Sequence, residues 1–98
     1  MPRPKAILIK PIDNVATVTE AIPGGVDVTF EKGGMTVTMQ VLDSIPMGHK
    51  FAVCDITQGE MVRKYGEAIG IATQLIPAGR HAHVHNIESA RGRGDRIA

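Results

Sequence analysis

The chain has 98 residues, a length that fits one domain with a modest core and leaves no room for a second. Hydrophobic residues make up 43% of it, which excludes a disordered chain, and with two phenylalanines, one tyrosine and no tryptophan the core must be aliphatic. Eleven basic and ten acidic residues give a formal charge of +1, which is too balanced for non-specific nucleic-acid binding.

The single cysteine and the N-terminal segment indicate in which cellular compartment we expect the protein. Cys54 alone cannot form an internal disulfide or a cysteine-rich zinc site. The apolar run at 6–9 is too short for the core of a signal peptide, and no stretch approaches the length of a membrane span. We therefore expect a cytoplasmic protein that binds neither nucleic acid nor membrane.

Short segments rich in apolar and β-branched residues recur between turn-forming glycines and prolines. They cover residues 6–9, 26–30, 35–42, 50–54, 60–65, 68–73 and 81–85. In MTVTMQVL (35–42) apolar and polar side chains alternate, as in a strand with one buried face. The pattern predicts a mostly β fold in one domain over residues 1–90, followed by a flexible Arg/Gly-rich tail over 91–98.

One segment favours a helix. Over residues 14–22, Val15, Val18 and Ile22 recur at helical spacing, polar residues at its start offer a cap, and Pro23 would end it. The same stretch also holds valines and threonines in strand-like order, so both interpretations stay open, and we predict one short helix.

A turn motif repeats along the chain. Ile-Pro-x-Gly occurs at 22–25, 45–48 and 76–79, each time followed by a strand-like segment, and a looser version occurs at 55–59. Proline presets its φ and glycine is free to adopt positive φ, so each copy predicts a tight turn that leads into a strand.

The segment RHAHVHN (80–86) is the densest group of histidines. In a continuous strand His81, His83 and His85 would share one face, with the outer pair about 13 Å apart. Zinc holds nitrogens at about 2.0–2.1 Å, so a neighbouring pair of these histidines could bind one metal, but all three could not. A third ligand would have to come from elsewhere, and His49 is the only other histidine. The simpler interpretation, preferred for His81, is a solvated strand face.

Three motifs together resemble a known family. DNVAT (13–17), the stretch IPMGHKFAVCDITQGEMVRKYGEAIGIAT (45–73) and IPAGRHAHVHN (76–86) resemble a SAF domain. The resemblance is closest to the N-terminal domain, or separate small subunit, of the altronate and galactarate dehydratases, and the sulfolactate sulfo-lyase small subunit is also similar. It runs from about Pro11 to Arg91 and is weakest over 24–37.

This resemblance implies a SAF-type β-clip fold and a class of reaction. The related enzymes are lyases that remove water or bisulfite from a hydroxy acid by β-elimination, with a divalent metal such as iron. A larger domain or subunit carries most of the catalytic machinery and most of the metal ligands. The chain is therefore expected to be a small subunit that completes a site on a separate large subunit, acting on a sugar acid such as altronate or galactarate.

The resemblance also proposes residue roles. His49 and His85 are expected to be catalytic, and His83 and His85 form the candidate metal pair. The residues expected to bind polar groups of the substrate are Asn14, Lys50, Asn86 and Arg91. β-Elimination needs a base for the α-proton, an acid for the leaving group and positive charge beside the carboxylate, which these residue types offer.

Other interpretations remain open. SAF domains also serve as binding or assembly modules with no catalytic part, for example at the end of sialic acid synthase or in flagellar ring assembly. The chain could also be the small subunit of a sulfolactate sulfo-lyase, or a fragment of a longer fused enzyme. Composition leaves the oligomeric state open, a homo-oligomer included.

Overall fold

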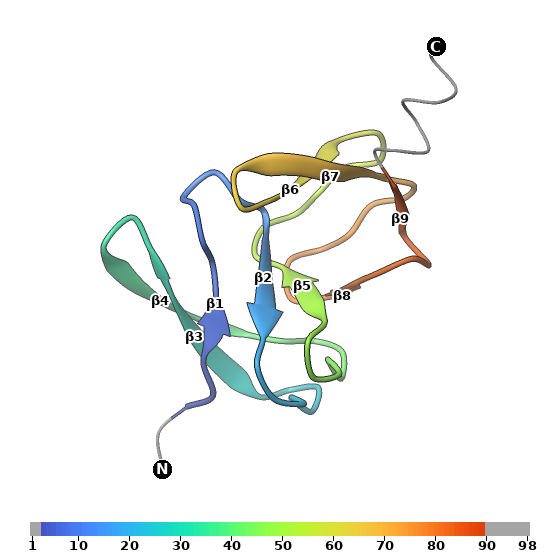
Figure 1. Cartoon of the computed structure of the whole chain (residues 1–98). Helices are drawn as coiled ribbons and strands as arrows, with labels where there is room; N and C mark the ends of the chain where they lie inside the picture. Colours follow the sequence, from blue (N-terminus) through green and yellow to red (C-terminus); the bar gives the residue numbers. More distant parts are fainter. Residues whose placement is uncertain (1–2, 90–98) are drawn as a thin grey trace.

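The computed structural model describes residues 3–89, which form strands and turns and contain no helix (Figure 1). The described part of the chain accordingly has no helix that could cross a membrane. The prediction of a mostly β fold is confirmed. The nine strands are β1 (Ala6–Ile7), β2 (Val15–Val18), β3 (Asp27–Lys32), β4 (Met35–Gln40), β5 (Lys50–Ala52), β6 (Met61–Lys64), β7 (Glu67–Ala72), β8 (His81–Ala82) and β9 (Ile87–Ser89).

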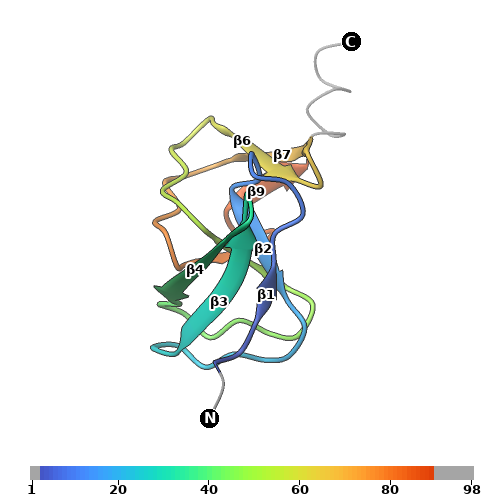
Figure 2. The same ribbon diagram turned by 90° about the vertical axis from the view of Figure 1, so that its left-hand side faces the viewer.

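The strands form three small antiparallel sheets. A central sheet has the order β1-β2-β5-β8, β3 pairs with β4 in a hairpin, and β6, β7 and β9 form the third sheet with β7 in the middle. In both views the hairpin β3–β4 and the sheet β6–β7–β9 lie toward opposite ends of the molecule, with the central sheet between them (Figures 1 and 2).

The central sheet separates two hydrophobic cores. Successive side chains of a strand point to opposite faces, so neighbours on one strand reach different cores. Ala16 of β2 and Phe51 of β5 are register partners that join the core beneath β3–β4, whereas Val15 and Ala52 join the core beneath β6–β7–β9. Burial on both faces makes the central sheet the rigid middle of the molecule.

The repeated turn motif forms four turns of one design, which confirms that prediction. They span residues 22–25, 45–48, 56–59 and 76–79. The glycine that ends each turn has φ between 79° and 91°, and the following residue donates its N–H to the carbonyl oxygen three positions back. The four isoleucines that begin the turns are buried and pair two by two, Ile22 with Ile45 and Ile56 with Ile76.

The predicted helix over 14–22 is wrong. Val15–Val18 form strand β2, and Ile22 begins the first turn. The error has a physical cause: because both faces of β2 are buried, its apolar residues do not alternate with polar ones and fit a helical spacing by coincidence.

The predicted strand over 81–85 is also wrong beyond its first two residues. The chain bends at His83 and turns, with the N–H groups of Asn86 and Ile87 both donating to the carbonyl oxygen of His83, at 3.1 and 2.9 Å. The turn leads into β9, which the sequence did not predict. The predicted tail over 91–98 lies outside the described residues, and the boundaries of the single domain stay a prediction.

Candidate functional site

Three histidines meet beside the central sheet. β5 pairs with β8, and in that register Phe51 lies opposite His81. His49 directly precedes β5 and His83 directly follows β8, so the pairing brings residues more than thirty positions apart to one edge. Nδ1 of His49 lies 2.9 Å from Nε2 of His81 in a hydrogen bond. One ring nitrogen of each of the three histidines lies within 4.8 Å of the others.

The rings of this trio lie close to one another and nearly parallel. The centroid of the His49 ring is 4.3 Å from that of His83 and 5.1 Å from that of His81, with interplanar angles of 28° and 26°. The His81 and His83 centroids are 5.6 Å apart at 11°. Neutral imidazoles can pack in this way, whereas three imidazolium cations would repel one another.

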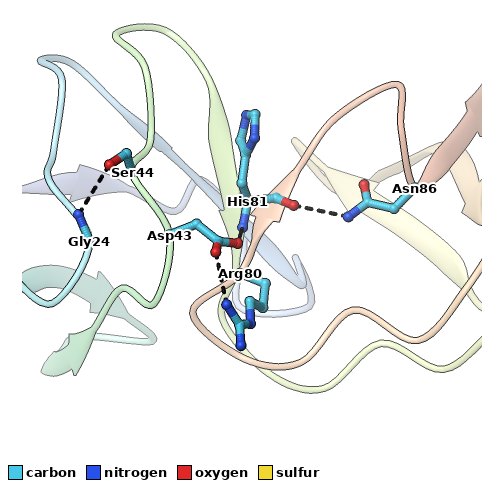
Figure 3. Close-up of polar contacts among 6 residues, drawn as sticks. All are labelled: Gly24, Asp43, Ser44, Arg80, His81 and Asn86. Atoms are coloured by element: carbon cyan, nitrogen blue, oxygen red, sulfur yellow. Dashed lines mark hydrogen bonds and ion pairs between the residues drawn. The ribbon is translucent and has the colours of Figure 1, made fainter.

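Asp43 fixes the start of β8. Its carboxylate accepts hydrogen bonds from the backbone N–H of His81 (3.0 Å) and from Nη1 of Arg80 (2.8 Å), as Figure 3 shows. The bond from the His81 N–H, aided by the Arg80 guanidinium, lowers the pKa of the Asp43 carboxyl. In the same view the ring of His81 points away from Asp43 and Arg80. Asp43 therefore positions the His81 backbone and leaves the imidazole free for other partners.

Asn86 fixes the other side of the site. It is 4% exposed, its Oδ1 accepts from the N–H of His83, and its Nδ2 donates to the carbonyl oxygen of His81, both at 2.9 Å (Figure 3 shows the second bond). The amide thus holds the backbone of His81 and His83 in the bend. Its place in the structure is that of a positioning residue.

Burial and neighbouring positive charges lower the pKa of two histidines of the trio. Burial first, and then the neighbouring histidines, lower the pKa of His81, and burial, His49 and Lys50 lower that of His83. Burial and the nearby Lys64 lower the pKa of the Lys50 ammonium. At neutral pH His81 and His83 therefore offer free lone pairs, the form that metal ligands and general bases need.

Two shallow pockets flank the trio. The first, of about 260 Å³, is polar and reaches His81, and the second, of about 190 Å³, reaches His83. Residues lining the first include Asp43, Gln74, Arg80, His81, His85 and Asn86. Residues lining the second are Lys50, Ile69, His83, Val84, Ile87 and Ser89. A small anionic molecule would meet Lys50 in the second pocket, whereas in the first the Arg80 guanidinium is paired with the Asp43 carboxylate.

The structure distributes the remaining predicted residues differently. Asn14 is 7% exposed, and its amide donates to the carbonyl oxygen of Met61 (2.9 Å) and accepts from the N–H of Arg63 (2.7 Å), so it ties β2 to β6. His85 is exposed, with its ring centroid 5.3 Å from that of His81. Arg91 lies outside the described residues. The roles assigned to these residues stay predictions.

Sequence reasoning missed two contributors. Arg80 stands beside His81 in the sequence and could have been found as part of the motif. Asp43 belongs to no recognisable sequence motif. Its contact with β8 joins residues 38 positions apart, which the sequence alone does not indicate.

The fold and the site therefore define the class of protein: an all-β domain with a histidine cluster beside its central sheet. A sequence model of the altronate/galactarate dehydratase SAF domain matches residues 4–90. The chain belongs to that family, and the resemblance seen in its motifs is confirmed.

Curated relatives agree with this family. The chain is 41% identical over 80 residues to altronate dehydratase from Escherichia coli, covering 82% of this chain and 15% of that protein. It is 38% identical over 79 residues to galactarate dehydratase (L-threo-forming) from the same organism, covering 78% and 14%. It is 45% identical over 56 residues to the (2R)-sulfolactate sulfo-lyase subunit alpha of Chromohalobacter salexigens, covering 57% and 60%. The matches thus span 60% or less of each relative's length.

Proposed function

We propose that the chain is the small subunit of a metal-dependent hydro-lyase that acts by β-elimination on a sugar acid such as altronate or galactarate, completing a site on a separate large subunit. The observation that carries this proposal is the trio of half-buried histidines, with Lys50 in a pocket beside His83, within a dehydratase-type SAF domain. The match to a relative named as a subunit supports the division into two chains.

The chemistry of β-elimination matches what the described residues offer. The reaction needs a base for the α-proton, and His49, half-buried in the trio beside β5, is proposed as a catalytic residue. His85, exposed beside the polar pocket, is the proposed acid for the departing hydroxide. Lys50, which lines the pocket beside His83, is proposed to supply positive charge for the carboxylate.

A divalent metal, iron in our expectation, would stabilise negative charge on the substrate as a Lewis acid, and in the complex the large subunit would supply ligands to it as well. In this chain the residues that fit such an ion are the imidazoles of the trio. The expected pair of His83 and His85 stays a prediction. Asn86 is proposed to act by holding the bend, and Asn14 by holding β2 against β6.

The test is reconstitution with the partner. A tagged chain purified from its native host is expected to bring down a larger subunit, and the complex should dehydrate altronate or galactarate. His49→Ala and His85→Ala should each lower kcat about 10²–10⁴-fold, the usual contribution of general acid–base catalysis. Thr38→Ala on the exposed side of β4 serves as the control and should leave turnover unchanged. Near-normal turnover in both histidine variants would contradict the catalytic assignment.

A second function is favoured by one observation, the 45% identity to a sulfo-lyase alpha subunit. Bisulfite and hydroxide both leave from the β-carbon of a hydroxy acid, so the same base could serve either reaction. Assaying the purified complex with sulfolactate beside the two sugar acids separates them. Turnover of sulfolactate alone would replace the hydro-lyase proposal, and a stable monomer that binds sugar acid without partner or metal would favour a non-catalytic binding module.

A further inference from the structure

We propose that His49, His81 and His83 form a three-histidine site for a divalent transition metal of the zinc, iron(II) or cobalt(II) type, and that this chain binds the ion without help from another subunit. The inference deepens the proposed function, on which any role of the ion in turnover rests. The ion-binding step itself rests only on the geometry of this chain.

The ligand atoms fit such an ion by type and spacing. Imidazole nitrogen suits zinc, iron and their neighbours, and the trio contains no carboxylate that would favour calcium or magnesium. Nitrogens bound at about 2.0–2.1 Å in a tetrahedral site lie about 3.3 Å apart. The nitrogens of His49 and His81 are now 2.9 Å apart and the three ligand atoms lie within 4.8 Å of one another, so forming the site takes shifts of up to about 1.5 Å.

Loading the site requires the rings to turn. The three rings are inclined to one another by only 11° to 28°, so their planes are nearly parallel and the lone pairs must be turned to meet at one point. Rotation about the Cβ–Cγ bond of histidine is soft, so the rings can turn to aim the three nitrogens at one ion. Within residues 3–89 the ring of His83 has no hydrogen-bond partner that such a turn would break.

The backbone that carries the ligands is held in place. β5 and β8 are paired in the central sheet, Asp43 holds the N–H of His81, and Asn86 bridges His81 and His83. Ligands on fixed backbone lose little freedom when the ion binds, which favours affinity. Their spacing thus results from tertiary structure and not from a flexible loop.

Three protein ligands leave coordination positions open. Catalytic zinc sites keep such an open position for water or substrate, whereas structural sites are closed by four protein ligands. Here His83 lines the pocket that contains Lys50, and a carboxylate or hydroxyl oxygen bound in that pocket could complete the shell. We infer that the ion takes an oxygen ligand of the hydroxy acid at that position.

The experiment uses the full chain alone, freed of metal with EDTA and titrated with Zn²⁺ by calorimetry and with Co²⁺ by absorption. We expect one ion per chain. His49→Gln, His81→Gln and His83→Gln should each weaken binding roughly 100-fold or more, while Thr38→Ala, a control on the exposed side of β4, should change it less than about threefold. In long-range proton–nitrogen NMR spectra, Zn²⁺ should shift the ring nitrogens of the trio and leave those of His85 in place.

Two outcomes would overturn the proposal. One is a folded, metal-free chain that binds neither ion below about millimolar concentration. The other is a His85→Gln loss as large as that of His81→Gln, which would instead indicate the pair His83 and His85. Circular dichroism of each variant without metal separates lost binding from lost folding. Because the readout is binding to the isolated chain, failure here leaves turnover by the reconstituted complex to be judged separately.

Discussion

The four turns share one backbone conformation, but two of them lead into hairpins and two lead into the central sheet beside the histidine trio. The turns at 22–25 and 56–59 lead outward into the hairpins β3–β4 and β6–β7, whereas those at 45–48 and 76–79 lead back into the central sheet as β5 and β8. Only the turns at 45–48 and 76–79 are followed closely by histidines of the trio. Since β5 and β8 are neighbours, two turns of the same local structure place their following residues in contact. The repeat provides the scaffold, and the adjacency of two of its copies provides the site.

The largest expected effect tests whether the equivalent turn glycines are equally replaceable. Gly79 and Gly59 have φ of 89° and 88°, so alanine is strained at both by about 1–2 kcal/mol. A Cβ at Gly59 would meet nothing within 4 Å, but one at Gly79 would lie 2.7 Å from the carbonyl oxygen of Gln40. We expect Gly79→Ala to lower the free energy of unfolding by about 3 kcal/mol or more, measured by urea denaturation.

Gly59→Ala is the matched control for that experiment, with an expected loss of about 1–2 kcal/mol. Equal losses in the two variants would mean that the close approach of Gln40 to the fourth turn is not maintained in solution.

The next effect concerns the bend that follows β8. Asn86→Ala removes a partner from the His83 N–H and from the His81 carbonyl, so we expect a loss of about 2–3 kcal/mol in urea denaturation. Asn14→Ala removes the same two kinds of bond between β2 and β6 and should cost about as much. The two should differ at the trio: only Asn86→Ala should shift the ring signals of His81 and His83 in NMR spectra. Unchanged signals there would refute the positioning role.

Much of the fold could be predicted because its determinants are local. Glycine at the end of Ile-Pro-x-Gly is needed for positive φ whatever the rest of the chain does, so the turns and following strands were found from the sequence. The alternation in 35–42 identified β4 for the same reason, since Val37 and Met39 face inward while Thr38 faces solvent. β2 was misassigned because burial on both faces depends on tertiary structure that a single segment does not show.

The site could be predicted only in part. The density of histidines at 81–85 was visible, and His49 was recognised as the one available third ligand. The assumption of a straight strand, however, placed His85 on the same face, since nothing local announced that Asn86 would bend the chain at His83. Asp43 was out of reach because its hydrogen bond to His81 spans 38 positions. The sequence thus identified the residue types of the site, but not the contacts between residues that lie far apart in the chain.

The smallest expected effect tests whether proline matters to the turns at all. Three turns have proline after isoleucine and the third in chain order has Thr57, whose N–H donates to the Glu60 carboxylate at 3.0 Å on the exposed surface. Thr57→Pro removes that bond and the one from the Thr57 hydroxyl to the same carboxylate (3.1 Å), both exposed, but restricts the unfolded chain by about 0.4–1 kcal/mol, so stability should stay within about 0.5 kcal/mol of the original in urea denaturation. Glu60→Pro, the control, removes an N–H that closes the turn and should cost more than about 1 kcal/mol.

A Thr57→Pro loss as large as that of the control would show that the third turn is not conformationally equivalent to the others. A neutral result would mean that proline in the other three contributes rigidity, while the glycine and the buried isoleucine set the geometry that brings β5 and β8 together.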